Sequence, residues 1–403
     1  MLRSITVGLA FLAVCFSNVS SASPQQSGGD AVGQPGIALK KPTTGRFVQL
    51  DDGRFMVPYA TTIPGTDVEF WMMPIPGGKF HMGSEDKEHP DEGPVFEVTV
   101  EPFWMAKHEI TWAEFERFMT MNGFFKELQA SGIRTINDRT IIDAVSAPSN
   151  LYAPDLTYDA GELPNQPAAT ITQFSAKQYT KWLSLSTNQF FRLPFETEWE
   201  YACRAGTTTK FYFGDDVELL PKHAWFDDNS DYQRHQVGQL TPNPWGLYDM
   251  LGNVSEWTLD QYDTKGYTQV AGRDLSKPLT TNEAFNKPTT LYPRTLRGGS
   301  WELLADDCRC SSRLGSSEEW KADDVNYPRS PWWFTSEIGT GAGFRIIRPL
   351  NAPHKENREH FWKADLKKIA RAVENRVERN GRGATAPVDA NLHRDIESLK
   401  KNK

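Results

Sequence analysis

Between residues 46 and 100, short apolar stretches alternate with turn residues. Residues 70–84, FWMMPIPGGKFHMGS, contain two apolar stretches separated by Pro-Gly-Gly, and in residues 96–100, FEVTV, every second side chain is apolar. Alternation with a period of two is typical of a strand with one buried face, and Pro-Gly-Gly favours a turn. The pattern predicts a strand, a turn and a strand over 70–84, and a half-buried strand over 96–100.

Apolar residues spaced by three and four predict two helices farther along the chain. The first, TWAEFERFMTMNGF, begins after Thr111, a residue type that often caps helices. The second covers residues 175–187, SAKQYTKWLSLST, and Ser175 is its expected cap. Both helices carry one apolar face, so both are expected to pack against a core.

A third, shorter helix is predicted over residues 196–206, ETEWEYACRAG, where Trp199 and Cys203 lie four positions apart and share a face. From there to residue 351 the pattern predicts loops, turns and short strands, with no internal repeat. The pattern over residues 46–351 therefore predicts two or three helices and many short strands.

The last segment, residues 352–403, differs from the rest because it carries 13 Lys and Arg against 8 Asp and Glu. Residues 359–379, EHFWKADLKKIARAVENRVER, predict one charged amphipathic helix. Its apolar stripe consists of Phe361, Leu366, Ile369, Ala370, Val373 and Val377. Such a basic helical tail can pack on the domain or remain solvated, and it can also contact a partner or an anionic envelope.

The first 22 residues have the order of a secretory signal, with Arg3, an apolar run over residues 5–16 and small residues up to Ala22. The apolar run is too short to span a bilayer. Residues 23–45 are rich in Gly, Pro, Ser and Gln and predict a disordered linker. We expect a secreted or periplasmic protein whose mature chain has no transmembrane segment.

Composition excludes few classes of function. The net charge of −8 argues against a general nucleic-acid binder. Aromatic residues make up 12% of the chain, which suits a fold whose rings fill gaps between loops and equally suits carbohydrate binding. No zinc-protease motif, Ser/His/Asp order, phosphate loop or dinucleotide fingerprint occurs in the sequence.

The chain contains four cysteines, of which Cys15 lies in the expected signal. Cys203, Cys308 and Cys310 remain in the mature protein. Disulfides are allowed in an oxidising compartment, and three cysteines indicate one bridge and one leftover thiol.

Six segments carry a resemblance to a known family. They are MPIPGGKFHMGS (73–84), HEITWAEFERFM (108–119), RLPFETEWEYACRAGT (192–207), PNPWGLYDMLGNVSEW (242–257), LRGGSW (296–301) and GFRIIRP (343–349). Their order and spacing resemble the formylglycine-generating enzymes, also called sulfatase-modifying factors, over about residues 68–350. The resemblance implies an irregular α+β fold related to C-type lectins. It also implies, as the founding activity, oxidation of a sulfatase cysteine to formylglycine with oxygen and copper(I). Relatives carry out other reactions, so the family indicates a scaffold more firmly than a chemistry.

The segment DMLGNVSEW places carboxylates at both ends of a turn that contains Gly252. Calcium takes six to eight oxygen ligands from carboxylates, carbonyls and water. By resemblance, the calcium ligands are Asp249, the carbonyls of Gly252 and Val254, and Glu256. The alternative is that the two carboxylates brace the turn by accepting backbone N–H groups.

In the copper enzymes of this family, a Gly-Gly-Ser turn is followed by Cys-x-x-x-x-Cys and then by Arg-Cys-x-x-Arg. RCSSR (309–313) matches the second part. The resemblance therefore implies a disulfide between Cys310 and Cys203, although Cys203 can instead pair with Cys308. With the first pairing, Cys310→Ala is expected to cost stability and Cys308→Ala to be nearly silent.

The copper-binding part of that pattern is not matched. Leu303 stands at the first copper-cysteine position, and the stretch from Ser300 to Arg309 is about three residues shorter than the pattern. Cys308 is on this count not aligned with the second position, so we expect no copper(I) site. Ser300 and Cys308 remain as candidate catalytic residues.

Residues 320–337 form an aromatic insertion before GFRIIRP. Trp320, Trp332 and Trp333, together with Trp301 after the double glycine, can line a remodelled binding groove. The alternative is that the rings of the insertion cover the altered cysteine loop as part of the core.

Two functional hypotheses follow. One is an exported sulfatase-modifying-factor-like protein that oxidises or modifies a sulfatase or another exported protein. The other is a non-catalytic, lectin-like module that binds glycans or a protein partner. The family resemblance favours the first, and the unmatched copper cysteines favour the second.

Overall fold

The computed structural model describes residues 33–321, 330–379 and 381–401. It mixes short helices with small sheets, so the predicted α+β class is confirmed. The expected signal, residues 1–22, lies outside the described residues. No helix in the described ranges is both long and apolar enough to cross a membrane.

The strands are short and belong to several sheets. They are β1 (Ile37–Ala38), β2 (Val48–Gln49), β3 (Phe55–Met56), β4 (Tyr59–Thr62), β5 (Glu69–Ile75), β6 (Gly78–Met82), β7 (Phe96–Val100), β8 (Phe103–Ala106), β9 (Ala144–Ala147), β10 (Ser255–Gln261), β11 (Leu279–Thr280), β12 (Arg294–Arg297), β13 (Arg313–Gly315), β14 (Ala342–Gly343), β15 (Ile347–Pro349) and β16 (Ala384–Pro387). The strand orders of the sheets are β1-β3-β2, β13-β12-β10-β14, β11-β7-β6, β15-β8-β5-β4 and β16-β9.

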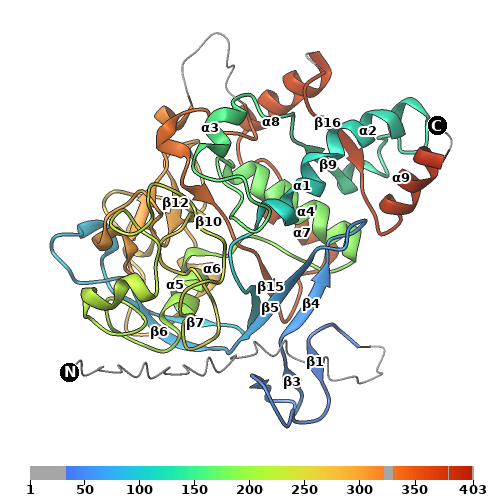
Figure 1. The fold of residues 1–403 in the computed structure, drawn as a ribbon. Coiled ribbons are helices and arrows are strands. Elements are labelled where there is room, and N and C mark those ends of the chain that lie inside the picture. The colour runs from blue at the N-terminus through green and yellow to red at the C-terminus, as the bar shows by residue number, and fades with distance from the viewer. Residues whose placement is uncertain (1–32, 322–329, 380, 402–403) are drawn as a thin grey trace, which may run out of the picture.

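The helices are also short. They are α1 (Trp112–Met119), α2 (Met121–Ala130), α3 (Pro154–Asp159), α4 (Gln173–Thr187), α5 (Glu196–Arg204), α6 (Thr281–Ala284), α7 (Lys355–Trp362), α8 (Lys367–Glu374) and α9 (Leu392–Lys401). Single turns are η1 (Pro90–Glu92), η2 (Ile141–Asp143), η3 (Val217–Lys222), η4 (Thr268–Val270), η5 (Ala305–Cys308), η6 (Glu318–Trp320), η7 (Glu337–Gly339) and the wider η8 (Asn375–Arg379). In Figure 1, α2, β9, β16 and α9 gather at the end of the molecule where the chain terminates.

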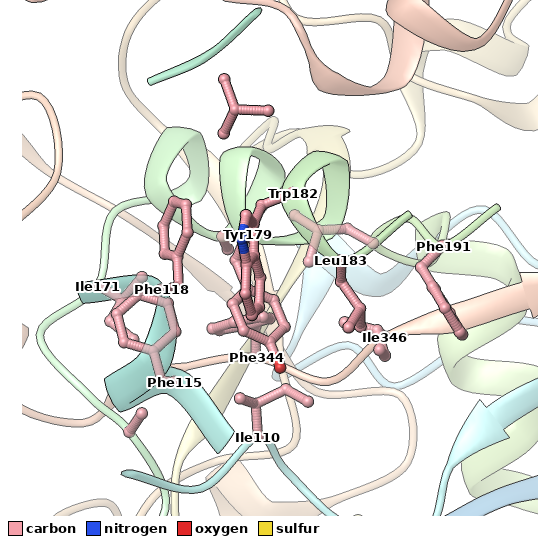
Figure 2. Packing of buried hydrophobic residues seen from close by; sticks show 14 of the residues in the cluster. Ile110, Phe115, Phe118, Ile171, Tyr179, Trp182, Leu183, Phe191, Phe344 and Ile346 are labelled. Atoms are coloured by element: carbon pink, nitrogen blue, oxygen red, sulfur yellow. The ribbon is translucent and has the colours of Figure 1, made fainter. Parts of the chain in front are cut away.

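Two buried clusters hold these elements together. The larger cluster lies around α1 and α4, and Figure 2 shows Phe115, Phe118, Tyr179 and Phe344 converging there. The smaller cluster surrounds α5 and contains all three cysteines of the expected mature chain. Large rings dominate the first cluster because each buries much apolar area where regular elements are few.

The strand predictions over 70–84 and 96–100 are confirmed as β5, β6 and β7. However, β5 and β6 do not pair with each other. β5 pairs with β4 and β8, whereas β6 pairs with β7. The Pro-Gly-Gly turn therefore carries the chain from one sheet to another.

The first helix is capped as predicted. The Thr111 hydroxyl accepts the Glu114 N–H, and the Glu114 carboxylate accepts the Thr111 N–H. The predicted cap of the second helix is wrong, because α4 begins earlier. Thr172 caps it, and its hydroxyl accepts the N–H of Ser175.

Helix α5 buries its charged residues together with Trp199 and Cys203. Each of its three glutamates meets an arginine. The pairs are Glu196–Arg313 at 2.6 Å, Glu198–Arg192 at 2.7 Å and Glu200–Arg297 at 2.5 Å. A buried carboxylate needs such a partner to offset the loss of water. The helix thereby joins β12 and β13 to the rest of the domain.

The aromatic insertion is part of the core rather than of a groove. Trp320, Trp332 and Trp333 are at most 4% exposed and belong to the larger cluster, which corrects the predicted binding role of these rings. Gly383 of the tail packs so closely on the Trp332 ring that a Cβ there would lie 2.5 Å from it. The described part of the insertion therefore fills space between domain and tail.

The linker and tail predictions also need correction. The predicted linker, residues 23–45, contains β1, which pairs with β3. The single helix predicted over 359–379 is divided into α7, α8 and η8. The chain leaves helical geometry before Asp365, whose carboxylate contacts Lys177 at 2.8 Å and Arg294 at 3.0 Å. These two ion pairs of the partly buried Asp365 lie at the break, which the apolar stripe alone could not indicate.

We expect Asp365→Asn to lower the free energy of unfolding by about 3–5 kcal/mol, because two buried cations lose their carboxylate. Burial alone raises the pKa of Asp365, but Lys177 and Arg294 together lower it. The contribution is therefore present at neutral pH and is lost as acid protonates Asp365. Chemical denaturation at pH 7 measures the loss. Glu374→Gln, at an exposed position of α8, is the matched control.

Candidate functional site

The double glycine after β12 makes a turn that no other residue type fits. Gly298 and Gly299 have φ of +101° and +76°, in the left-handed region. A Cβ on Gly299 would lie 2.5 Å from the Sγ of Cys308, and one on Gly298 would lie 3.1 Å from the Trp199 ring. The turn therefore brings the backbone directly against Cys308 and places Ser300, which is buried, at its end.

This turn lies on the segment that was predicted to bind calcium. The Gly252 N–H donates to the Gly298 carbonyl at 2.7 Å. The Ser255 hydroxyl donates to the Gly299 carbonyl at 3.0 Å. Together, this backbone hydrogen bond and this side-chain hydrogen bond hold the turn against residues 249–257.

Glu256, a predicted calcium ligand, is used by the protein itself. Its Oε1 accepts from Arg345 Nη2 at 2.5 Å. Its Oε2 accepts from Arg345 Nε at 2.5 Å and from Trp199 Nε1 at 2.7 Å. The carboxylate thus ties α5, β10 and the segment before β15 together.

Asp249 and Glu109 complete a buried carboxylate group around Arg345. Asp249 accepts the Gly238 N–H at 2.7 Å, and Glu109 accepts the Val254 N–H at 3.1 Å. Burial, partly offset by the Gly238 N–H and Arg345, raises the pKa of Asp249 to about 6. Burial, with Asp249 and Glu256 nearby, raises the pKa of Glu109 well above its usual range.

The two carboxylates among the predicted calcium ligands already have partners within the protein. Both oxygens of Glu256 face protein donors, and Asp249 holds the backbone of Gly238. In the ranges that the structure describes, no three His, Cys, Asp or Glu side chains are grouped so that they could hold a metal. Asp249 matches the alternative, in which a carboxylate braces the turn by accepting a backbone N–H. Glu256 instead accepts from the side chains of Arg345 and Trp199.

Glu302, two residues beyond Ser300, has the properties of a functional carboxylate. Burial raises its pKa to about 7, against the lowering effect of the Thr340 hydroxyl, the Gly341 N–H and Arg234. The Thr340 hydroxyl lies 3.4 Å from the Glu302 carboxylate. A group that changes its charge near neutral pH is suited to binding or proton transfer.

Arg234 is fully buried beside this carboxylate. Its guanidinium donates to the carbonyls of Thr157, Gly161 and Thr340 at 2.7–3.1 Å. Burial lowers its pKa to about 10, while Glu302 acts to raise it. Thr340 touches both side chains and so couples the arginine to the carboxylate.

Exposed apolar side chains lie on the segments next to Glu302 and on the segments hydrogen-bonded to them. Tyr232 is 77% exposed, Leu304 is 62% exposed and Ile338 is 57% exposed. Their segments are tied to one another, because the Asp227 N–H donates to the Leu303 carbonyl and Arg234 donates to Thr340. We call Tyr232, Glu302, Leu304 and Ile338, together with the half-buried Trp301, the turn face.

Sequence comparison identifies the family to which this site belongs. Residues 66–326 match the family model described as "Sulfatase-modifying factor enzyme 1-like domain". The chain belongs to this sulfatase-modifying factor family. The resemblance inferred from the six segments is thereby confirmed.

Several family members are similar to this chain. "Formylglycine-generating enzyme" of Mus musculus is 27% identical over 64% of this chain and 73% of that protein. "Inactive C-alpha-formylglycine-generating enzyme 2" of Bos taurus is 26% identical over 64% and 86%. "Serine/threonine-protein kinase pkn1" of Chlamydia caviae is 28% identical over 60% of this chain, but the match spans only 35% of that protein.

Solved structures support the fold. "Structure of PvdO from Pseudomonas aeruginosa" has a TM-score of 0.50 and 24% identity, covering 79% of this chain and all of that one. "Treponema denticola variable protein 1" also has a TM-score of 0.50, with 21% identity over 73% of this chain and 99% of that one. At these identities the likeness concerns the fold alone.

Within this family fold, the thiols occupy distinct places. Cys203 Sγ and Cys310 Sγ face each other at 3.0 Å. Cys308 is fully buried against Gly299, and burial raises its pKa, so it is held as a thiol rather than a thiolate. This packing argues against the expectation that Cys308→Ala is nearly silent, because removal of a buried sulfur leaves a cavity.

The spacing of residues after the double-glycine turn corrects the predicted alignment of Cys308. Counted forward from the double-glycine turn, Leu303 takes the place of the first copper cysteine. Four residues separate Leu303 from Cys308, which is the Cys-x-x-x-x-Cys spacing. Cys308 therefore holds the second position of the copper pattern, and the shortening falls after it. Leu303 still leaves the site with one sulfur where two are needed.

Some predicted residues come together and others do not. The structure places Ser300, Trp301 and Cys308 at the turn, with Asp249, Gly252, Val254 and Glu256 beneath it. Sequence reasoning missed Glu302 and Arg234. The acidic residue two positions after GGS was a usable signal for Glu302, whereas nothing in the pattern near Arg234 indicated its burial.

We expect Gly299→Ala to destabilise the protein by about 1–3 kcal/mol more than Gly53→Ala. Both glycines have positive φ, but a Cβ on Gly53 meets nothing within 4 Å, whereas one on Gly299 meets Cys308. Denaturant unfolding of the two variants separates the contact from the backbone effect. Equal losses would mean that the turn can move away from Cys308.

For the thiols, we expect one free cysteine, Cys308, in protein recovered from an oxidising compartment. Maleimide labelling in denaturant should add one label to the wild type and none to Cys308→Ala, with Cys203 and Cys310 joined in a peptide map. Cys308→Ala should cost about 1 kcal/mol for its cavity, and Cys310→Ala about 2–4 kcal/mol for the lost bridge. A label on Cys203 or Cys310 would contradict the assignment.

Proposed function

We propose that this chain binds an extended polypeptide segment at the turn face and does not itself carry out copper-dependent cysteine oxidation. The observation that carries the proposal is the partly buried Glu302 carboxylate, on a surface whose connected segments expose Tyr232, Leu304 and Ile338. Burial raises the pKa of Glu302 to about 7. Apolar anchors around one charged group are typical of surfaces that recognise peptides.

The thiol chemistry supports binding over oxidation. Copper(I) takes soft thiolate ligands, and two are needed to hold it in the family's manner. Leu303 supplies no ligand, so Cys308 would be a single sulfur ligand at this position. The named inactive relative of Bos taurus is consistent with a family fold that persists without the founding reaction.

The backbone at Tyr232 adds support for a binding role. Asp231 and Tyr232 have φ of +52° and +57°, which costs of the order of 1–3 kcal/mol for each such residue. The Tyr232 side chain is nevertheless directed to solvent. A strained and exposed aromatic residue is more readily explained by contact with a ligand than by packing.

A peptide is favoured over a glycan as the ligand. The glycan hypothesis depended on a groove of several tryptophans, but Trp320, Trp332 and Trp333 are buried. Leu304 and Ile338 offer aliphatic contacts, which suit apolar side chains better than sugar hydroxyls. The Glu302 carboxylate favours a cationic residue in the bound segment.

The partner is proposed to be an exported protein, with a sulfatase as the first candidate. Export is part of the proposal and depends on the predicted signal over residues 1–22. The sulfatase motif Cys-x-Pro-x-Arg contains the arginine that Glu302 would bind. The proposal concerns this chain alone and not the activity of the longer chlamydial relatives.

The test uses a sulfatase-derived peptide whose motif cysteine is replaced by serine, so that no chemistry interferes. We expect fluorescence polarisation to show binding that strengthens as pH rises from 6 to 8, because Glu302 gains its charge through a pKa of about 7. Leu304→Glu should abolish binding, whereas Leu39→Glu, at a similarly exposed leucine elsewhere, should not.

Glu302→Gln provides the decisive comparison. It should weaken binding at pH 8 about tenfold, as expected for a lost charged hydrogen bond, and should remove the pH dependence. A pH dependence that survives in Glu302→Gln would contradict the assignment of that dependence to Glu302. Conversion of the cysteine peptide to formylglycine in the presence of copper, seen by mass spectrometry, would contradict the proposal.

A further inference from the structure

A small cavity lies between the domain and the tail helix α8, away from the turn face. It has a volume of about 120 Å³. Its apolar wall includes Trp257, Phe334, Ile369 and Ala372, and Arg294 lines it from β12. Because α8 contributes Ile369 and Ala372, the cavity exists only where the tail covers the domain.

Arg294 has one donor unused. Its Nε donates to the Thr290 carbonyl at 2.9 Å, and Nη1 donates to Gln173 at 3.1 Å and Asp365 at 3.0 Å. Its Nη2 is buried and has no acceptor among the described residues, although the side chain is only 4% exposed. A buried donor without an acceptor is unfavourable, so it calls for a partner.

The charge beside the cavity is also unbalanced. Asp365 is the acceptor for both Lys177 and Arg294. Two buried cations thus share one carboxylate. The cavity is also lined by two further cations, Lys321 and Lys368, and by one carboxylate, Glu318. An anion bound in the cavity would balance the excess positive charge and would accept from Arg294 Nη2.

Helix α8, which covers the cavity, makes few buried contacts with the domain. None of the residues of α8 is buried, although Ile369 and Val373 pack against the larger cluster. The helix is connected to the domain mainly through its flanks, where Trp362 donates to the Phe191 carbonyl and Asp365 makes its ion pairs. A molecule between α8 and Trp257 would add contacts that the helix lacks.

We propose that this cavity is a binding site for a small aromatic carboxylate, which joins α8 to the domain. The carboxylate accepts from Arg294 Nη2, and the ring lies among Trp257, Phe334, Ile369 and Ala372. The volume is close to that of engineered cavities of about 150 Å³ that bind benzene. A single ring therefore fits, whereas long acyl chains exceed the space.

Benzoate is the probe, and benzamide is its neutral counterpart of the same shape. With the full chain, isothermal titration calorimetry should show benzoate binding about tenfold or more tightly than benzamide, since only benzoate offers a charged acceptor to Arg294. Benzoate should also slow tryptic cleavage after Lys367 and Lys368, because it holds α8 against the domain.

Two substitutions in α8 make a matched pair. Ala372→Leu fills the cavity and should reduce benzoate affinity at least about tenfold. Ala370→Leu, on the exposed side of the same helix, should leave it unchanged. Arg294→Met should bring benzoate and benzamide to equal affinity, and if this variant does not fold, the alanine pair decides alone.

Three results would overturn the proposal. They are no benzoate binding to the wild type, equal affinity for benzoate and benzamide, and unchanged benzoate affinity in Ala372→Leu. The site is independent of the turn face, so its failure would leave the proposed peptide binding untouched, and the reverse also holds.

Discussion

The pairing of Arg345 with Glu256 supports everything around the double-glycine turn. The guanidinium binds both carboxylate oxygens and donates to the carbonyls of Tyr248 and Asp249. Residues 249–257 are thereby held in one shape, and the turn at Gly298 and Gly299 lies on them through hydrogen bonds. Buried charges of this kind allow only one arrangement, because a shifted partner would leave an ion without compensation.

Ion pairs also join distant segments in other parts of the molecule. The glutamates of α5 meet arginines from β12 and β13, and Asp365 draws the tail onto Lys177 and Arg294. A fold with short strands and many loops has few long hydrogen-bonded ladders. Specific charged contacts between distant segments supply orientation that regular sheets provide elsewhere.

The turn face and the cavity each contain a charged group whose interactions within the protein are incomplete. Glu302 and Arg234 are coupled through Thr340 without a direct ion pair, so the carboxylate stays free to respond to pH and to a cationic ligand. Arg294 keeps one donor unused beside an apolar space. In both places neighbouring residues fix the position of a charged group without occupying all of its hydrogen-bonding capacity. Binding sites commonly contain such groups.

Local signals in the sequence determined the strands over 70–84 and 96–100, the Thr111 cap, the glycines of the turn and membership of the family. These features depend on periodicity, capping and backbone freedom, which neighbouring residues decide. The tertiary structure alone decided that Glu256 pairs with Arg345, that Trp332 belongs to the core, and that the helix of the tail breaks at Asp365. Each of these outcomes depends on a partner far away in the chain. For a buried residue, the free energy of contact with that partner exceeds the local preference for one secondary structure.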